Sequence, residues 1–205
     1  MDVEQESALQ PSGDHSEQVP EVASALTTDI VSLILRVTFG VIFLGHATQK
    51  LGWFKGGGYP TSISTQADFV KFMGYDHTHL MAWLITLTEA ASGILLLAGL
   101  CTPLAVAGML GVNFQFIAGV QWNFGLFGNT TGGSGFELPL MMSAGIAALG
   151  FVGAGRFSVD HKLRWNLRGP RWGLAAIALA VVAGSIVLVG FGLGFGGQPT
   201  FPAKP

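Results

Sequence analysis

The sequence contains very little charge. Of its 205 residues only 11% are Asp, Glu, Lys or Arg, whereas 50% are hydrophobic. A soluble domain usually carries about 25% charged residues, so this chain lacks the polar surface that such a domain needs. Several apolar runs approach the roughly 20 residues that cross a bilayer. The composition therefore predicts an all-α, multi-pass integral membrane protein with room for one small helical bundle.

Cysteine is almost absent as well. The single residue Cys101 excludes a disulfide within the chain and an iron–sulfur cluster held by this chain alone. His46 is the only histidine inside an apolar run, which argues against a haem. His77 and His79 alternate in a connecting segment, but two histidines alone are a weak metal signal. We therefore predict no metal site.

The few charges are unevenly distributed and divide the chain into three parts. Seven of the twelve acidic residues precede residue 30, and five of the ten basic residues lie between 156 and 171. We predict a disordered acidic cytoplasmic tail at 1–29, a transmembrane four-helix bundle at 30–160, and a basic connection with a fifth transmembrane segment at 161–205. The positive-inside rule places the basic cluster in the cytoplasm. That location suits anionic lipid, so we expect no nucleic-acid partner.

Five apolar runs are the predicted membrane spans, at residues 30–51, 80–100, 104–120, 136–153 and 173–195. The first carries a polar stripe, because Arg36, Phe43, His46 and Lys50 recur at seven, three and four residues. Such a stripe cannot face lipid, since an unpaired polar group in hydrocarbon costs several kcal/mol. We expect Arg36 to be the exception and to extend toward the cytoplasmic head groups.

The remaining polar residues of the spans fall mostly in the half of the bundle that should face outward. A carboxylate, an imidazole and an amine around one cleft can relay protons or hydrogen-bond the carbonyl oxygens of a quinone. The candidates for catalysis are His46, Glu89 and Glu137, and the candidates for contact with a quinone are Gln49, Lys50, Gln115 and Trp122. We expect Glu89 and His46 to share one polar site. The alternative, that these groups only fix the helices against one another, stays open.

Three segments resemble the DoxX family of small bacterial four-helix membrane proteins. They are RVTFGVIFLGHATQKLGWF, TEAASGILLLAGLCTPLAVAG and GFELPLMMSAGIAALGFVGAGRFSVD, and the resemblance covers about residues 30–160. The specific elements are His46 with Gln49-Lys50-Leu51, the glutamate Glu89, the Gly-x-Glu motif at 135–137 and the Gly-Arg-x-Ser-x-Asp motif at 155–160. The resemblance implies a bacterial plasma membrane protein with a four-helix core. The acidic tail and the fifth apolar run depart from that pattern.

The resemblance leaves the function open between three hypotheses. The family name comes from a subunit of a quinone-linked oxidoreductase, and relatives look like membrane components that assemble with soluble redox or stress-response enzymes. This implies a membrane component of such a system, with a quinone as the cofactor and protein partners that handle the electrons. The second hypothesis is a non-catalytic anchor that recruits soluble enzymes. The third is a carrier of protons or small solutes, which the absence of two similar broken-helix halves disfavours.

Overall fold

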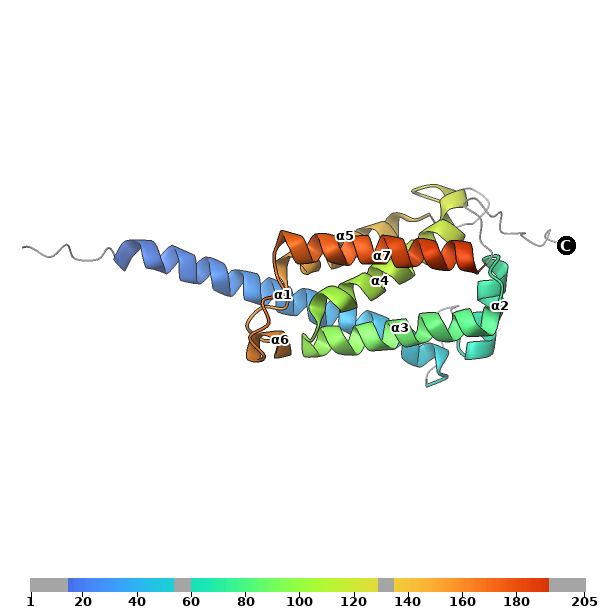
Figure 1. Ribbon diagram of the computed structural model, residues 1–205, viewed down its shortest axis with the longest axis horizontal. Coiled ribbons are helices and arrows are strands. Elements are labelled where there is room, and N and C mark those ends of the chain that lie inside the picture. The colour runs from blue at the N-terminus through green and yellow to red at the C-terminus, as the bar shows by residue number, and fades with distance from the viewer. Residues whose placement is uncertain (1–14, 54–59, 129–134, 192–205) are drawn as a thin grey trace, which may run out of the picture.

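The computed structural model describes residues 15–53, 60–128 and 135–191, and within them all regular structure is helical. Five long helices lie roughly along one axis (Figure 1). The elements are α1 (His15–Lys50), α2 (Ile63–Phe72), α3 (Thr78–Ala98), α4 (Thr102–Gly119), the 3₁₀ turn η1 (Gln121–Phe124), α5 (Glu137–Val152), α6 (Val159–Lys162) and α7 (Pro170–Gly190). The all-α prediction is confirmed.

Four of the five expected spans are long and apolar enough to cross a membrane: residues 24–50 of α1, α3, α4 and α7. The C-terminal span is thus confirmed. The exception is α5, which has 16 residues and so reaches only about 24 Å, against a hydrocarbon core of about 30 Å. α5 is therefore an apolar helix that is shorter than the four candidate spans. The chain is a multi-pass membrane protein.

The long helices alternate in direction along the chain. α1 packs against α3, α3 against α4, and α7 against both α4 and α5. The short helix α2 lies across one end of this bundle, and α6 lies at the opposite end (Figure 1). We call these the α2 end and the α6 end. α7 reaches the α2 end, where the amide of Asp76 donates a hydrogen bond of 2.8 Å to the carbonyl oxygen of Phe191.

The first helix is longer than expected. α1 begins at His15, so residues 15–29 continue the helix and are not the disordered tail that their acidic composition predicts. Residues 1–14 lie outside the described part of the chain. Adding turns to an existing helix avoids the cost of nucleation, and the adjoining span supplies that nucleus. The added turns project beyond the α6 end of the bundle (Figure 1).

Helices α1 and α3 come closest at two glycines. A Cβ atom on Gly93 would lie 3.0 Å from the carbonyl oxygen of Gly40, and one on Gly40 would lie 2.8 Å from a side-chain carbon of Leu97. Small residues allow helix backbones to approach in this way where no hydrophobic effect drives association. This close contact sets the spacing at which a side chain of α1 can reach one on α3.

Arg36 does not extend toward the head groups as the sequence analysis expects. It is only 1% exposed, and its guanidinium donates four hydrogen bonds to backbone carbonyl oxygens. Two of these oxygens belong to the last turn of α3, at Leu96 and Leu97, and two lie between α5 and α6, at Ala154 and Phe157. The carbonyls at a helix C-terminus have no partner within the helix and carry partial negative charge. Arg36 therefore joins three segments at the α6 end.

The orientation of the bundle is a testable prediction. Five basic residues between 156 and 171 resist translocation, so the α6 end should face the cytoplasm. In a Cys101→Ser background, a thiol introduced as Lys162→Cys should not react with a membrane-impermeant maleimide in intact cells, and should react after the cells are opened. Reaction in intact cells would reverse the orientation.

Candidate functional site

A buried ion pair joins α1 to α3. The Nζ atom of Lys50 lies 2.6 Å from Oε1 and 2.5 Å from Oε2 of Glu89, and the two side chains are only 6% and 4% exposed. Lys50 is the last residue of α1, and Glu89 lies in the middle of α3. Each charge offsets part of the cost of burying the other, because both carboxylate oxygens face the ammonium group. The pair thus connects α1 to α3, and Glu89 lies one helical turn from the glycine contact at Gly93.

Two further predicted site residues lie on the same last turns of α1. Gln49 is 6% exposed and precedes Lys50, while His46 is half-buried one turn earlier. Residues four apart on a helix share a face, so His46 and Lys50 point to the same side of α1. The ammonium of Lys50 holds the Glu89 carboxylate. A site shared by His46 and Glu89 stays a prediction.

Gln115 belongs to a second polar cluster, which links α4, α7 and the turn before α3. Its Nε2 atom donates a hydrogen bond of 2.7 Å to the carbonyl oxygen of Gly184, and its Oε1 atom accepts one from the hydroxyl of Tyr75. Burial raises the pKa of Tyr75, so this hydroxyl stays protonated and can donate. Tyr75 is absent from the sequence-based candidates, because a tyrosine in the connection between the first two spans does not by itself indicate a bond to Gln115.

Glu137 and Trp122 do not join either cluster. Glu137 opens α5 with an exposed side chain, and Trp122 is 64% exposed and stacks on Phe136 with ring centroids 5.7 Å apart. The expected single site thus divides into the ion pair, the Gln115 cluster and an exposed surface. A shared depth in the membrane does not place residues on facing sides of their helices.

Gln66 on α2 is a further residue that sequence reasoning missed. It is fully buried, and neither its Nε2 nor its Oε1 atom has a hydrogen-bond partner among the described residues. Buried side-chain amides are normally paired. No motif in the sequence distinguishes this glutamine, because it lies in a short amphipathic helix outside the apolar runs.

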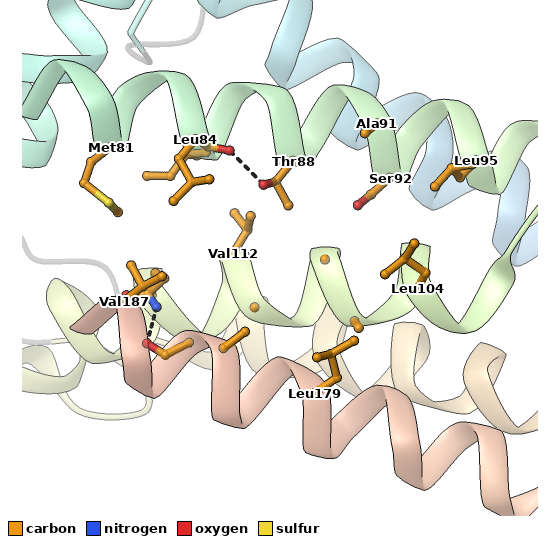
Figure 2. Close-up of a pocket in the computed structure, with 17 residues that line it drawn as sticks. Met81, Leu84, Thr88, Ala91, Ser92, Leu95, Leu104, Val112, Leu179 and Val187 are labelled. Atoms are coloured by element: carbon orange, nitrogen blue, oxygen red, sulfur yellow. Dashed lines mark hydrogen bonds between the residues drawn. The ribbon is translucent and has the colours of Figure 1, made fainter. Parts of the chain in front are cut away.

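A groove of about 430 Å³ runs between α3, α4 and α7 (Figure 2). Its walls are mostly aliphatic, with Met81, Leu84, Leu95, Leu104, Val112, Leu179 and Val187 among the 17 lining residues. Gly108 and Gly111 form its floor on α4 in place of larger side chains. All three helices are candidate membrane spans, so the groove lies within the apolar part of the protein.

Few polar groups reach this groove. The hydroxyl of Thr88 donates to the carbonyl oxygen of Leu84 at 2.7 Å and is thereby satisfied within its own helix. Ser92 is 4% exposed, and its hydroxyl occupies the space above Gly108, since a Cβ atom there would clash with Oγ. Gln115 lines the α4 wall of the groove. An apolar channel with a hydroxyl and an amide is suited to a lipophilic molecule that carries a few oxygen atoms.

The fold and the buried polarity define a multi-pass helical membrane protein with an ion pair between its first two spans. Residues 31–122 match the sequence model of the DoxX family and form a DoxX family domain. The matched segment includes the ion pair and Gln115, whereas Glu137 and the motif at 155–160 lie beyond it. Comparisons with curated proteins and with solved structures gave no match.

Proposed function

We propose that this protein is the membrane component of a quinone-linked redox system and that the groove between α3, α4 and α7 holds the quinone. The groove is the observation that carries the proposal. Its volume of about 430 Å³ falls within the roughly 300–1,000 Å³ typical of small-molecule sites, and its walls suit an isoprenoid chain. A ligand dissolved in the bilayer can enter between membrane helices without crossing water.

Two side chains can orient the quinone ring. The Ser92 hydroxyl is one donor, and the second N–H of the Gln115 amide is another, because the Gly184 carbonyl occupies only one of the two. Hydrogen bonds from neutral donors to the ring carbonyl oxygens would hold the ring without requiring a buried charge. Electrons would come from a soluble partner, since the single cysteine supplies no ligand set for an iron–sulfur cluster.

In this proposal His46, Lys50 and Glu89 are the candidates for the proton site. The ion pair joins α3 to α1, and the neighbouring residue Thr88 lines the groove. Successive residues of a helix point about 100° apart, so Glu89 points away from the centre of the groove without lying on the opposite face of α3. A proton released at the groove would have to pass Ser92 or water to reach Glu89.

The second candidate function is a non-catalytic anchor. Large apolar side chains are exposed at the α2 end, where the exposed fractions are 77% for Trp53, 64% for Trp122 and 80% for Phe127. Aromatic residues in such positions can lie at the membrane interface or bind a partner. An anchor needs the ion pair only for packing and does not need the groove at all.

A variant that fills the groove distinguishes between quinone binding and the anchor function. Gly111 can accept a side chain, because the nearest atom to a Cβ there is 3.9 Å away, and Gly111→Leu would extend into the groove. We expect purified wild-type protein to be stabilised by a short-chain ubiquinone or menaquinone, with the midpoint of thermal unfolding rising by several degrees. Gly111→Leu should abolish that rise while the protein remains folded.

The matched control is Gly45→Leu. A Cβ on Gly45 meets nothing within 4 Å, and this glycine is not among the groove residues. Gly45→Leu should respond to the quinone as the wild type does. If Gly111→Leu also keeps the full response, the quinone does not occupy this groove. If quinone leaves the unfolding midpoint of the wild-type protein unchanged, the result favours the anchor.

A further inference from the structure

A second pocket lies at the α6 end, outside the groove and the ion pair. Its volume is about 430 Å³, and it is formed by α1 together with the connection between α5 and α7. In contrast to the groove, half of its twelve lining residues are charged or titratable. The charged and titratable residues that line it are Asp29, Arg156, Asp160, His161, Arg164 and Arg168.

Both acidic residues of this pocket are already bound by the protein. Asp29 accepts hydrogen bonds from the backbone amide and the guanidinium of Arg156. Asp160 accepts from the amide of Cys101 at 2.8 Å, and from the amide and hydroxyl of Thr102 at 3.1 and 2.9 Å. The acids are thus committed to joining α1 and α4 to the connection between α5 and α7.

In the described part of the chain, two of the three arginines of the pocket are not paired with an acidic residue in this way. Within the described residues, Arg164 and Arg168 form no ion pair, although both line the pocket. Arg164 also has a φ angle of 57°, a left-handed conformation that disfavours a side chain and that glycine adopts readily. The backbone therefore holds an arginine where a glycine would fit with less strain.

Exposed apolar side chains lie in the same connection as these arginines. Phe157, Leu163 and Trp165 are 56%, 48% and 47% exposed, and all three lie in the connection between the end of α5 and the start of α7. Because both helices end here, the connection lies at the boundary of the membrane. A cationic pocket bordered by exposed apolar and aromatic side chains combines the two features that bind a lipid: a charge for the phosphate and a surface for the chains.

We infer that this pocket binds the phosphate of an anionic phospholipid, with Arg164 and Arg168 as the groups that contact the head group. Guanidinium groups form paired, charge-assisted hydrogen bonds with phosphate oxygens. A free phosphate has the same chemistry, but it gains nothing from Phe157, Leu163 and Trp165, so the lipid is the ligand that uses the whole surface. This inference is independent of the quinone proposal.

The test measures lipid binding to the full chain in a neutral detergent by native mass spectrometry. Dioleoyl phosphatidylglycerol should bind more tightly than dioleoyl phosphatidylcholine. The double variant Arg164→Gln/Arg168→Gln should lose roughly tenfold or more in affinity for phosphatidylglycerol. Lys162→Gln/Arg171→Gln removes the same charge from the same end of the bundle but outside the pocket, and it should change the affinity by less than about twofold.

A third variant is the control for loss of folding. Arg164→Gly relieves the left-handed strain, so it should melt at or above the wild-type temperature and still bind phosphatidylglycerol more weakly. Equal losses in the pocket variant and in its control, or unchanged affinity in both pocket variants, would overturn the inference. If millimolar inorganic phosphate competes for the site as effectively as phosphatidylglycerol does, the site binds a soluble anion and the lipid is rejected as its ligand.

Discussion

Removing one member of the buried ion pair should destabilise the protein by about 3–5 kcal/mol, because the other charge would remain buried without a partner. Glu89→Leu and Lys50→Met should therefore each lower the midpoint of thermal unfolding strongly or prevent accumulation in the membrane. The double variant Lys50→Met/Glu89→Leu should recover most of that stability, since an apolar pair of similar volume avoids the desolvation of both charges. The unfolding free energies of the wild type, the two single variants and the double variant in detergent give the coupling energy between Lys50 and Glu89.

The double variant also tests the role of the pair. If Lys50 and Glu89 only fix α1 against α3, the double variant should keep the quinone-induced stabilisation and the quinone-dependent activity. If Glu89 carries a proton, the double variant should be folded and bind quinone but lose activity. Losses in the double variant that equal the sum of those in the single variants would show that the two side chains do not act as a pair.

Replacing Arg36 should have a comparably large effect. Its guanidinium serves four carbonyl oxygens while only 1% exposed, and hydrogen bonds to charged groups contribute about 1.5–3 kcal/mol each. Arg36→Ala would remove all four of these hydrogen bonds in an apolar setting, so we expect loss of accumulation in the membrane. Arg36→Lys should not restore accumulation, because an ammonium group has three donors and cannot reach four oxygens arranged around a planar guanidinium group.

The matched control is Arg171→Ala. Arg171 is exposed and lies 5.7 Å from the ring centre of Trp172, a contact worth about 0.5–1 kcal/mol at an exposed site. This variant should accumulate at close to the wild-type level. Normal accumulation and melting of Arg36→Ala would contradict the joining role of Arg36.

The helices themselves follow from the sequence, whereas their pairing does not. Long apolar runs locate α3, α4 and α7 within a few residues, because the bilayer imposes one length and a hydrogen-bonded backbone. The 16 residues of α5 show the limit of that rule. The stripe on the first span correctly places Lys50 toward protein, but nothing in the chain identifies Glu89, 39 residues away, as its partner.

The errors share one physical cause, which is that depth in a membrane does not fix direction around a helix axis. Gln115 and Glu137 lie toward the same end of the bundle, yet one is bonded to Gly184 and the other is exposed. For Arg36 the sequence shows a charge near an interface and cannot show that α3 ends beside it. Tyr75 can be recognised as the partner of Gln115 only from the structure, in which the turn before α3 packs against α4.

Photoaffinity labelling with an azido-quinone tests the central claim most directly. Wild-type protein in native membranes is irradiated with the probe, with and without excess natural quinone, and the labelled peptides are mapped by mass spectrometry. We predict competed labels within residues 81–95, 104–115 and 179–187, which hold the groove, and their loss in Gly111→Leu but not in Gly45→Leu. Competed labels confined to the α2 end around Trp122 and Glu137, or labelling that natural quinone does not reduce, would contradict quinone binding in the groove.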